Sequence, residues 1–342
     1  MMEYDVTIGI PVYKSVEFIR QSLESALSQT YPSIEFLIVD DAGCDGSIEI
    51  IKALQATHHK GKDIHIINHS YNLGVSSSRN RIIDDAQGKY LYFMDSDDTI
   101  AVNTIELLMK NVRLYDAEIV FGSYEKIETN GMRTQYRYPS LKLLKEDELA
   151  SFAYRKYAGI QASVCNYLVK TSVLHENNLR FIDTNYWEDL VFTFDLVTKI
   201  SRAVLLPDIT YSYICRENSL SHYQHREYIS KNEVMQNVKA INHLKETSSL
   251  LYNKAYFPNR CYNIAMTDFY ISCNILKRRK VIHPSISNKE IKEMMAHPAT
   301  WLQICSFQQT KMLNQFFWGL SKLPSSLCVM IIWFIGKAKK LL

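Results

Sequence analysis

The residues with the clearest capacity for chemistry are three carboxylates that lie within four positions. Tyr90–Met94 is a run of large apolar residues typical of a short buried strand, and Asp95, Asp97 and Asp98 follow at its carboxyl end. Open α/β sheets hold their ligands at that edge. Acidic groups this close together repel one another unless a cation lies among them, and oxygen ligands suit Mg²⁺ or Mn²⁺. The run predicts a divalent-metal site. The alternative is an acidic turn in which Asp97 or Asp98 caps a following helix.

Alternating strands and helices would position these acids. Short apolar and β-branched runs predict strands at residues 6–10, 34–39, 64–67, 90–94 and 119–124. Helical spacing between these strands predicts an α/β fold with a mostly parallel sheet and helices on both faces. Further polar groups would gather at its edge, from Asp40 and Asp41 on one loop and Arg79 and Asn80 near another. Such an edge suits a nucleotide, although GxGxxG and GxxxxGK[ST] are both absent.

Composition and charge restrict the class of protein. The 342 residues are 47% apolar and 22% charged, which is typical of a globular chain long enough for two lobes. A net charge of +3 gives no basic field of the kind that binds nucleic acid. Seven cysteines occur without a CxxC pair, which favours a reducing compartment without structural zinc. No secretory signal is visible, so we expect a cytoplasmic protein.

Four blocks of the sequence match a known family. In order, they are Ile8–Tyr13, Val39–Asp41 with Asp45–Ser47, Asn72–Gly74 with Ser78–Asn80, and Met94–Asp98. Their order and spacing resemble those of the family 2 glycosyltransferases. Weaker matches follow at Trp187–Phe192 and at Tyr211–Tyr213 with Arg216–Ser219. The resemblance implies a GT-A (Rossmann-like) fold and inverting transfer of a sugar from a nucleotide diphosphate. The turn 42–44 departs from the Gly-Ser-Thr-like turn common in that family, which alters the loop more than the acidic positions.

The resemblance also implies roles for individual residues. Pro11, Tyr13 and Asp41 would form the pocket for the base, typically uracil, with the Asp41 carboxylate accepting a hydrogen bond from a base N–H. The alternatives are a turn residue for Asp41 and a core position for Tyr13. Asp95 would reach the ribose or the sugar, and Asp97 would bind the metal that bridges the diphosphate.

Other charged side chains would surround the diphosphate. Arg79, early in a predicted helix, would meet its oxygens or the base-binding carboxylate with bidentate geometry, or else lie on a solvated helix face. Arg216 would close over the phosphates as part of a lid. Asp98 would bind the metal or orient its neighbours. His222 would complete the metal shell or touch the diphosphate, unless it is a surface residue.

Asp189 is the candidate general base, and Glu188 is its competitor. Inverting transfer needs one carboxylate to take the proton from the acceptor hydroxyl. Both acids fall in the first turn of a predicted helix, where the helix dipole also favours carboxylates for structural reasons. A helix start lowers the pKa of a carboxylate and burial beside Trp187 raises it, so the sequence leaves the balance open.

Three regions are expected along the chain: 1–124 as the nucleotide-sugar-binding half, 125–224 as the acceptor side of the catalytic domain, and 225–342 as a mainly helical region. The last region contains Leu327–Ile335, nine apolar residues that cannot cross roughly 30 Å of hydrocarbon. Lys337, Lys339 and Lys340 follow. This pattern predicts a peripheral anchor to anionic lipid on the inner face of the cell membrane. The alternative is a helix docked on the core or on a second subunit.

The expected function is therefore an inverting glycosyltransferase with a UDP-sugar donor and Mn²⁺ or Mg²⁺ on the diphosphate. Its acceptor would be a hydroxyl of a glycan or of a lipid-linked saccharide, as in polysaccharide biosynthesis. One alternative is a non-catalytic nucleotide-sugar-binding protein whose acceptor cleft no longer functions. Another is a metal-dependent nucleotidyltransferase or phosphohydrolase that uses the same acidic loop.

Overall fold

The computed structural model describes residues 4–155, 159–216 and 228–342. The chain divides into two compact units. The first comprises Met1–Leu149, Ala162–Asn185 and Leu196–Asn218, and the second comprises Ala150–Gln161, Tyr186–Asp195 and Ser219–Leu342. The expected division into regions at 124 and 224 stays a prediction.

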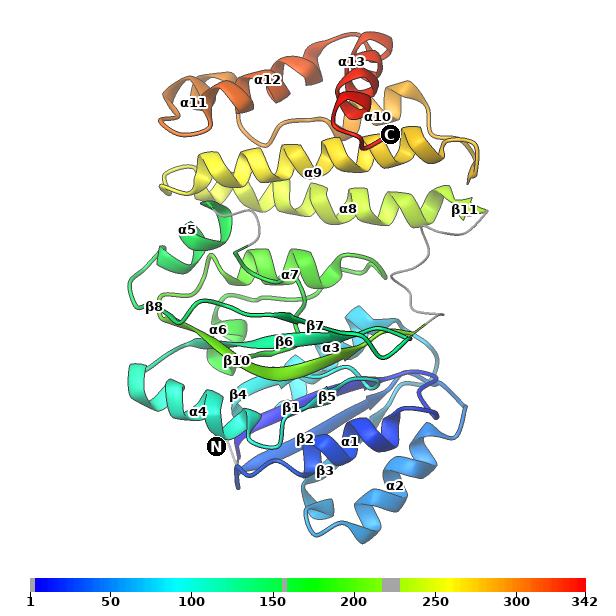
Figure 1. The fold of residues 1–342 in the computed structure, drawn as a ribbon, viewed down its shortest axis with the longest axis vertical. Helices are drawn as coiled ribbons and strands as arrows, with labels where there is room; N and C mark the ends of the chain where they lie inside the picture. The colour runs from blue at the N-terminus through cyan, green and yellow to red at the C-terminus, as the bar shows by residue number, and fades with distance from the viewer. Residues whose placement is uncertain (1–3, 156–158, 217–227) are drawn as a thin grey trace. The chain divides into compact units, whose positions relative to one another are not determined.

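A ten-stranded sheet forms the centre of the first unit in the described part of the chain (Figure 1). Four parallel neighbours follow the order β3-β2-β1-β4, namely β3 (Ile64–Asn68), β2 (Ile34–Asp40), β1 (Tyr4–Val12) and β4 (Gly88–Phe93). The order continues through β9 (Tyr167–Lys170), β6 (Ile119–Ile127), β10 (Ala203–Ile214) and β5 (Thr99–Ile100). β9 runs antiparallel to both β4 and β6, whereas β6 and β10 are parallel. β7 (Arg133–Tyr136) pairs with β6, and β8 (Leu141–Leu143) pairs with β10.

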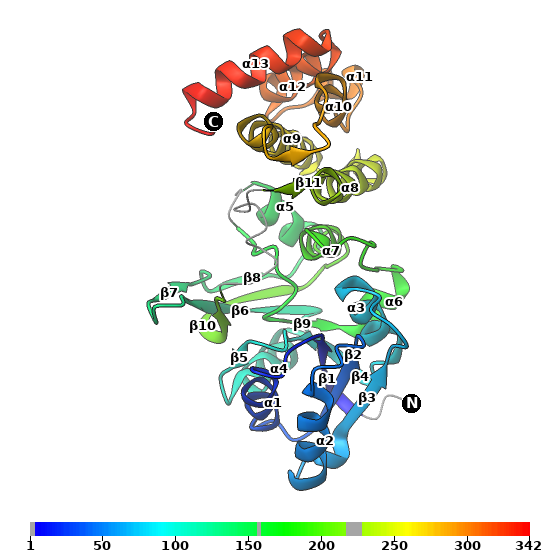
Figure 2. The same cartoon turned by 90° about the vertical axis from the view of Figure 1, so that its right-hand side faces the viewer.

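Helices cover this sheet on both faces, as predicted. They are α1 (Ile19–Leu27), α2 (Ser47–Thr57), α3 (Val75–Asp85), α4 (Thr104–Tyr115) and α6 (Thr171–Glu176). α1 and α4 lie on one side of the sheet, and α3 and α6 lie on the other (Figure 2). Gly9 of β1 permits the close approach of α3, because a Cβ at this position would lie 2.3 Å from Cγ2 of Ile82. The predicted α/β class with a GT-A-like sheet is confirmed.

Several strand boundaries differ from the sequence-based expectation. β1 continues through Pro11 to Val12 instead of stopping at Ile10. Pairing with β4 ends at Gly9, so the missing N–H of Pro11 breaks no bond to that neighbour. The long strand β10 absorbs register shifts against β6 between Leu205 and Tyr211.

The second unit is mainly helical. Its helices are α7 (Glu188–Leu196), α8 (Lys231–Ser248), α9 (Phe257–Arg278), α10 (Asn288–Met294), α11 (Trp301–Ser306), α12 (Lys311–Lys322) and α13 (Ser325–Ala338), and α5 (Glu148–Arg155) contributes its C-terminal part. α8 and α9 pack side by side (Figure 2). β11 (Ile229–Ser230) pairs with β12 (Ile282–His283), and this pairing ties the start of α8 to the segment after α9. Among the described helices, none has the length and hydropathy needed to cross a membrane.

Local sequence signals fix several of these helix starts. Capping boxes begin α8 at Ser230 with Glu233, α10 at Ser287 with Glu290, and α11 at Thr300 with Gln303. Pro324 is the N-cap of α13, which separates α13 from α12 at the interruption that the sequence predicts.

A buried ionic network holds α7 to α8 and α9 in the second unit. The Arg260 guanidinium is fully buried and donates to Oδ1 of Asp195 at 3.0 Å and to Oγ of Ser248 at 2.8 Å. It also donates to the Tyr154 hydroxyl. Nε2 of His243 lies 2.9 Å from the other oxygen of Asp195. Burial opposes ionisation of Asp195, but the His243 hydrogen bond and the Arg260 charge outweigh it and lower the pKa of Asp195.

We predict that Arg260→Leu lowers the free energy of unfolding of the second unit by about 3–5 kcal/mol, because it leaves the Asp195 carboxylate buried without its cation. All four tryptophans lie in this unit, so tryptophan fluorescence in a guanidinium titration reports its unfolding. Lys289→Leu, on the exposed surface of α10, is the control and should change stability by less than about 0.5 kcal/mol. An Arg260→Leu protein as stable as this control would show that the network contributes little.

Candidate active site

The three carboxylates of the acidic run converge directly after β4. One oxygen each from Asp95, Asp97 and Asp98 lies within 4.8 Å of the others. No helix follows them directly, since β5 begins at Thr99 and α4 at Thr104, with Asn103 as its N-cap. The helix-capping alternative for Asp97 and Asp98 is therefore wrong.

Each of these acids has a different partner. Nη2 of Arg79 donates to Oδ1 of Asp95 at 3.0 Å, and the Arg216 guanidinium forms an ion pair with Asp97. Asp98 is buried and accepts from the Tyr211 hydroxyl at 2.6 Å and from the backbone N–H of Ile214 at 2.8 Å. Two arginines thus compensate the two more accessible carboxylates, and neutral donors hold the buried one.

Burial and the neighbouring charge of Asp95 raise the pKa of Asp98 to about 7. Burial is the larger cause of this rise, and the negative charge of Asp95 adds to it. Three carboxylates with oxygens this close form a hard-oxygen donor set that fits Mg²⁺ or Mn²⁺. Asp95 and Asp97 are partly exposed and are the more accessible oxygen donors, whereas both oxygens of Asp98 already accept hydrogen bonds.

Arg79 lies early in α3, as predicted, but its side chain is buried. The guanidinium carbon lies 5.5 Å from the centroid of the Phe181 ring. This packing and the bond to Asp95 contradict the alternative of a solvated helix face. On the Asp97 side, the guanidinium carbon of Arg216 lies 4.3 Å from the centroid of the Phe18 ring. Aromatic faces therefore support both arginines.

Asp41 follows β2 and organises a neighbouring loop. Its Oδ1 accepts from the backbone N–H of Leu73 at 2.8 Å and contacts Nδ1 of His69 at 2.8 Å. Its Oδ2 accepts from the N–H of Gly74 at 2.8 Å. Gly74 has a φ of +88°, which favours glycine at the start of α3. A carboxylate oxygen has two lone pairs, so Oδ2 of Asp41 can accept one more hydrogen bond.

Pro11 and Tyr13 lie at the end of β1, next to Asp41. The backbone N–H of Asp41 donates to the carbonyl of Val12 at 2.9 Å, which ties the two loops together. Tyr13 is 44% exposed, so its alternative role as a core residue is wrong. Pro11 is partly exposed beside it. β1, β2 and β4 are parallel neighbours, so these residues and the acidic cluster share one sheet edge.

Glu188 and Asp189 lie in the second unit, in the first turn of α7 as predicted. Glu188 is buried, while Asp189 is partly exposed and its Oδ1 accepts from the N–H of Leu190 at 2.7 Å. The acidic cluster belongs to the first unit, so the role of either residue as general base stays a prediction. His222 lies outside the described residues, and its role as a metal ligand also stays a prediction.

Two residues of this site were missed by sequence reasoning. Tyr211 lies in a block already matched to the family, and its alternation with Tyr213 on a strand could have directed one hydroxyl toward the acids. His69 follows β3 as a single histidine without a motif, and only the pairing of β3 with β2 places it beside Asp41.

We predict a pH dependence of stability from Asp98 in EDTA. Its pKa is about 7 in the folded chain and about 3.9 in an unfolded one, so the folded state keeps a proton there that the unfolded state loses. The folding stability that this proton adds is present in full below about pH 4 and is lost as the pH rises to about 7. Between pH 5 and pH 8, the melting temperature of Asp98→Asn should therefore fall less than that of the wild type, as measured by circular dichroism. The exposed Asp84→Asn is the control, and equal falls in all three proteins would contradict the prediction.

Comparison with known proteins agrees with this geometry. The Glycosyl transferase family 2 model matches residues 7–169. The glycosyltransferase GlyA of Streptococcus pneumoniae is 34% identical over 133 residues, which are 39% of this chain and 18% of that protein. The cholesterol galactosyltransferase of Borreliella burgdorferi is 24% identical over 281 residues, which are 79% of this chain and 76% of that protein. The chain thus spans less than a fifth of GlyA but most of the Borreliella protein.

A solved structure extends the similarity beyond the matched residues. S. aureus TarS 1–349 in complex with UDP-GlcNAc has a TM-score of 0.64 at 16% identity and covers 93% of this chain and 90% of that chain. At this identity the similarity shows the fold alone. The match over residues 7–169 identifies that part of the chain as a family 2 glycosyltransferase domain, and the shared fold and the acidic site after β4 agree with a GT-A architecture.

Proposed function

We propose that this protein transfers a sugar, with inversion, from a UDP-sugar to a hydroxyl of a glycan or lipid-linked acceptor. The observation that carries the proposal is the cluster of Asp95, Asp97 and Asp98 at the same sheet edge as Asp41. A nucleotide diphosphate needs a partner for its base at one end and compensation of its charge at the other. This edge offers both.

The donor would lie along this edge. The free acceptor position on Oδ2 of Asp41 suits a base N–H, and the exposed ring of Tyr13 suits stacking on the base. Arg79 and Arg216 supply positive charge for the diphosphate oxygens. Asp95 and Asp97 would hold Mn²⁺ or Mg²⁺, which when bound neutralises charge on the leaving diphosphate. The similarity to TarS, whose structure contains UDP-GlcNAc, supports UDP as the nucleotide.

The acceptor hydroxyl would be deprotonated by Asp189, with Glu188 as the alternative. Asp189 is the more accessible of the two, and the helix start at α7 favours its ionised form. An ionised carboxylate can take the proton while the hydroxyl oxygen attacks the anomeric carbon from the face opposite the diphosphate. The block Trp187–Phe192 that resembles a family motif supports this assignment.

Asp189→Asn should retain UDP-sugar binding but lose at least about 100-fold in transfer rate, since it removes the base and leaves the first unit unchanged. Asp97→Asn should instead weaken binding of the donor in the presence of Mn²⁺. The assays are calorimetry with UDP-sugars and release of UDP with an acceptor. Glu188→Gln is the matched control, and a larger loss there than in Asp189→Asn would assign the base to Glu188.

The products distinguish the alternatives. Sugar transfer releases UDP, whereas nucleotidyl transfer releases pyrophosphate. A non-catalytic binding protein would bind the donor and show no difference between Asp189→Asn and the wild type. Release of pyrophosphate, or binding of no UDP-sugar by the wild-type protein, would contradict the proposal.

We further propose that the C-terminal helices contact a membrane. One face of α13 is buried against α9 and α10, and the other exposes Met330 and Phe334, four residues apart. α12 likewise exposes Met312 and Phe316, and Leu302 of α11 is 82% exposed. We infer that these five exposed residues together form one apolar surface. Lysines lie on the same helices, with Nζ of Lys337 4.2 Å from the centroid of the Trp333 ring and Nζ of Lys322 5.1 Å from that of Trp318. Apolar side chains with lysines on the same helices fit an anionic lipid interface.

Phe334→Ser combined with Phe316→Ser should weaken binding to vesicles that contain phosphatidylglycerol at least tenfold, because two large apolar side chains no longer enter the bilayer. Co-sedimentation with these vesicles and with neutral phosphatidylcholine vesicles measures the effect. Leu250→Ser, at a 79% exposed position away from these helices, should bind as the wild type does. Equal binding by the double variant and this control would contradict membrane contact through the apolar surface.

A further inference from the structure

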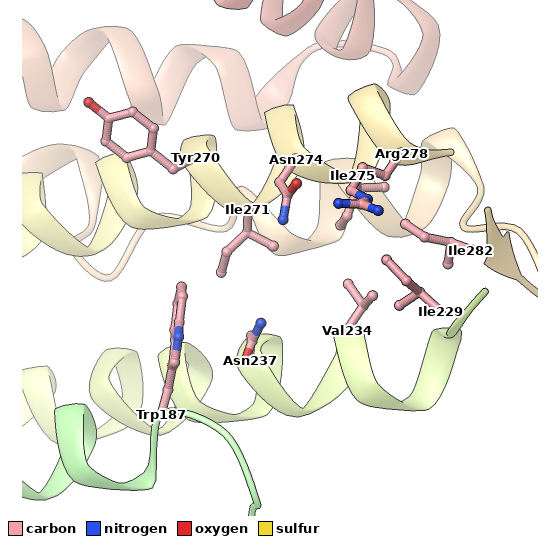
Figure 3. A pocket seen from close by; sticks show the side chains of 10 residues that line it. All are labelled: Trp187, Ile229, Val234, Asn237, Tyr270, Ile271, Asn274, Ile275, Arg278 and Ile282. Atoms are coloured by element: carbon pink, nitrogen blue, oxygen red, sulfur yellow. The ribbon is translucent and has the colours of Figure 1, made fainter. Parts of the chain in front are cut away.

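A cavity of about 230 Å³ lies within the second unit, between α8 and α9 and beside the start of α7 (Figure 3). Its lining residues are Trp187, Ile229, Val234, Asn237, Tyr270, Ile271, Asn274, Ile275, Arg278 and Ile282. Nothing in the family blocks of the sequence reaches α8 or α9. The residues of the candidate donor site in the first unit therefore do not explain this cavity.

Half of the ten residues that line the cavity are aliphatic. Ile229, Val234, Ile271, Ile275 and Ile282 are all buried and line it from both helices and from the paired segments β11 and β12. A bare saccharide would place hydroxyl groups against these side chains, at a large cost in desolvation. A hydrocarbon chain would bury apolar surface on them. The wall therefore favours a ligand with an aliphatic part.

One cationic side chain, that of Arg278, lines the cavity together with these aliphatic residues. The guanidinium of Arg278 lies beside Ile275, and the amides of Asn237 and Asn274 face the same space from the two helices (Figure 3). A guanidinium binds phosphate oxygens with paired N–H groups, and amides add further hydrogen bonds. An apolar cavity with a few converging polar groups is the usual form of a small-molecule site.

One residue that lines the cavity, Trp187, directly precedes the two candidate bases in the sequence. Trp187 points from the start of α7 toward α9, and Glu188 and Asp189 follow it directly (Figure 3). Trp187 has a φ of +63°, a conformation that is uncommon for a bulky residue and that persists where its surroundings hold it, often at functional sites. This backbone geometry sets the indole against the cavity at the point where the helix with the acids begins.

We propose that this cavity binds the lipid part of an anionic lipid acceptor, with an acyl or prenyl chain along the isoleucines and a phosphate group on Arg278. The proposal rests on the proposed function, since it names the class of acceptor. The lipid would hold the acceptor in the same unit as Asp189 and Glu188. It would do so through contacts that a soluble saccharide cannot make.

The test uses the full chain with Trp301, Trp318 and Trp333 changed to phenylalanine, so that Trp187 alone reports binding. The probes are octyl, decyl and dodecyl phosphate below their micelle concentrations. We expect one site, with affinity that rises about fourfold per methylene until the cavity is filled. Arg278→Gln should weaken binding at least tenfold, whereas Lys277→Gln, the exposed neighbour outside the cavity, should leave it unchanged.

Two further variants keep the result decisive. Ile271→Phe reduces the space in the cavity and should abolish binding while Trp187 stays the single tryptophan, and if it fails to fold, the pair Arg278→Gln and Lys277→Gln decides alone. Phe334→Ser should bind alkyl phosphate as the wild type does, and loss of binding there would assign the lipid to the surface of α13 and overturn the proposal. Equal affinity in Arg278→Gln, Lys277→Gln and the wild type would also overturn it.

Donor binding separates this proposal from the proposed function. UDP-sugar binding should be unchanged in Arg278→Gln, because Arg278 belongs to the second unit and the donor residues to the first. A wild-type protein that binds UDP-sugar but no alkyl phosphate would locate the error in the acceptor class alone. A wild-type protein that binds no UDP-sugar would refute the function whatever the lipid result.

Discussion

Repulsion among the carboxylates after β4 is the constraint on which the first unit depends. Asp95, Asp97 and Asp98 have oxygens within 4.8 Å, and each needs a different source of compensation. Arg79 comes from α3, Arg216 follows β10, and the Tyr211 hydroxyl comes from β10 itself. The sheet must therefore bring β10 back to β4 through β9 and β6 before the acids can be held together. The half of the sheet with strands in both directions thus supplies partners for the acids that follow β4 in the parallel half.

The sequence predicts the parallel half well because its signals are local. The run 90–94, the acids after it and the turn at Gly74 each carry their own periodicity or conformational preference. What it could not predict depends on pairing between distant strands. His69 reaches Asp41 only because β3 pairs with β2, and a single histidine without a motif gives no sign of that. Tyr211 was visible as part of a block, but its bond to Asp98 required the position of β10 in the sheet.

In the second unit, the sequence indicates where helices begin better than it indicates the contacts between them. The capping boxes and Pro324 fix where α8, α10, α11 and α13 begin, and these signals need only neighbouring residues. The contact of Arg260 with Asp195 joins residues 65 positions apart, and no spacing rule predicts it.

The two units face different physical demands. A UDP donor has a fixed base and diphosphate, so the residues that hold it need fixed charges and backbone donors. The first unit supplies these through Asp41, Arg79 and the acidic run. An acceptor is recognised by shape and by burial of apolar surface, which many aliphatic side chains can supply in many arrangements. Family motifs can therefore be short and strict in the first unit, while the helices around Ile271 and Arg278 carry no motif and would, under the proposal, select the acceptor.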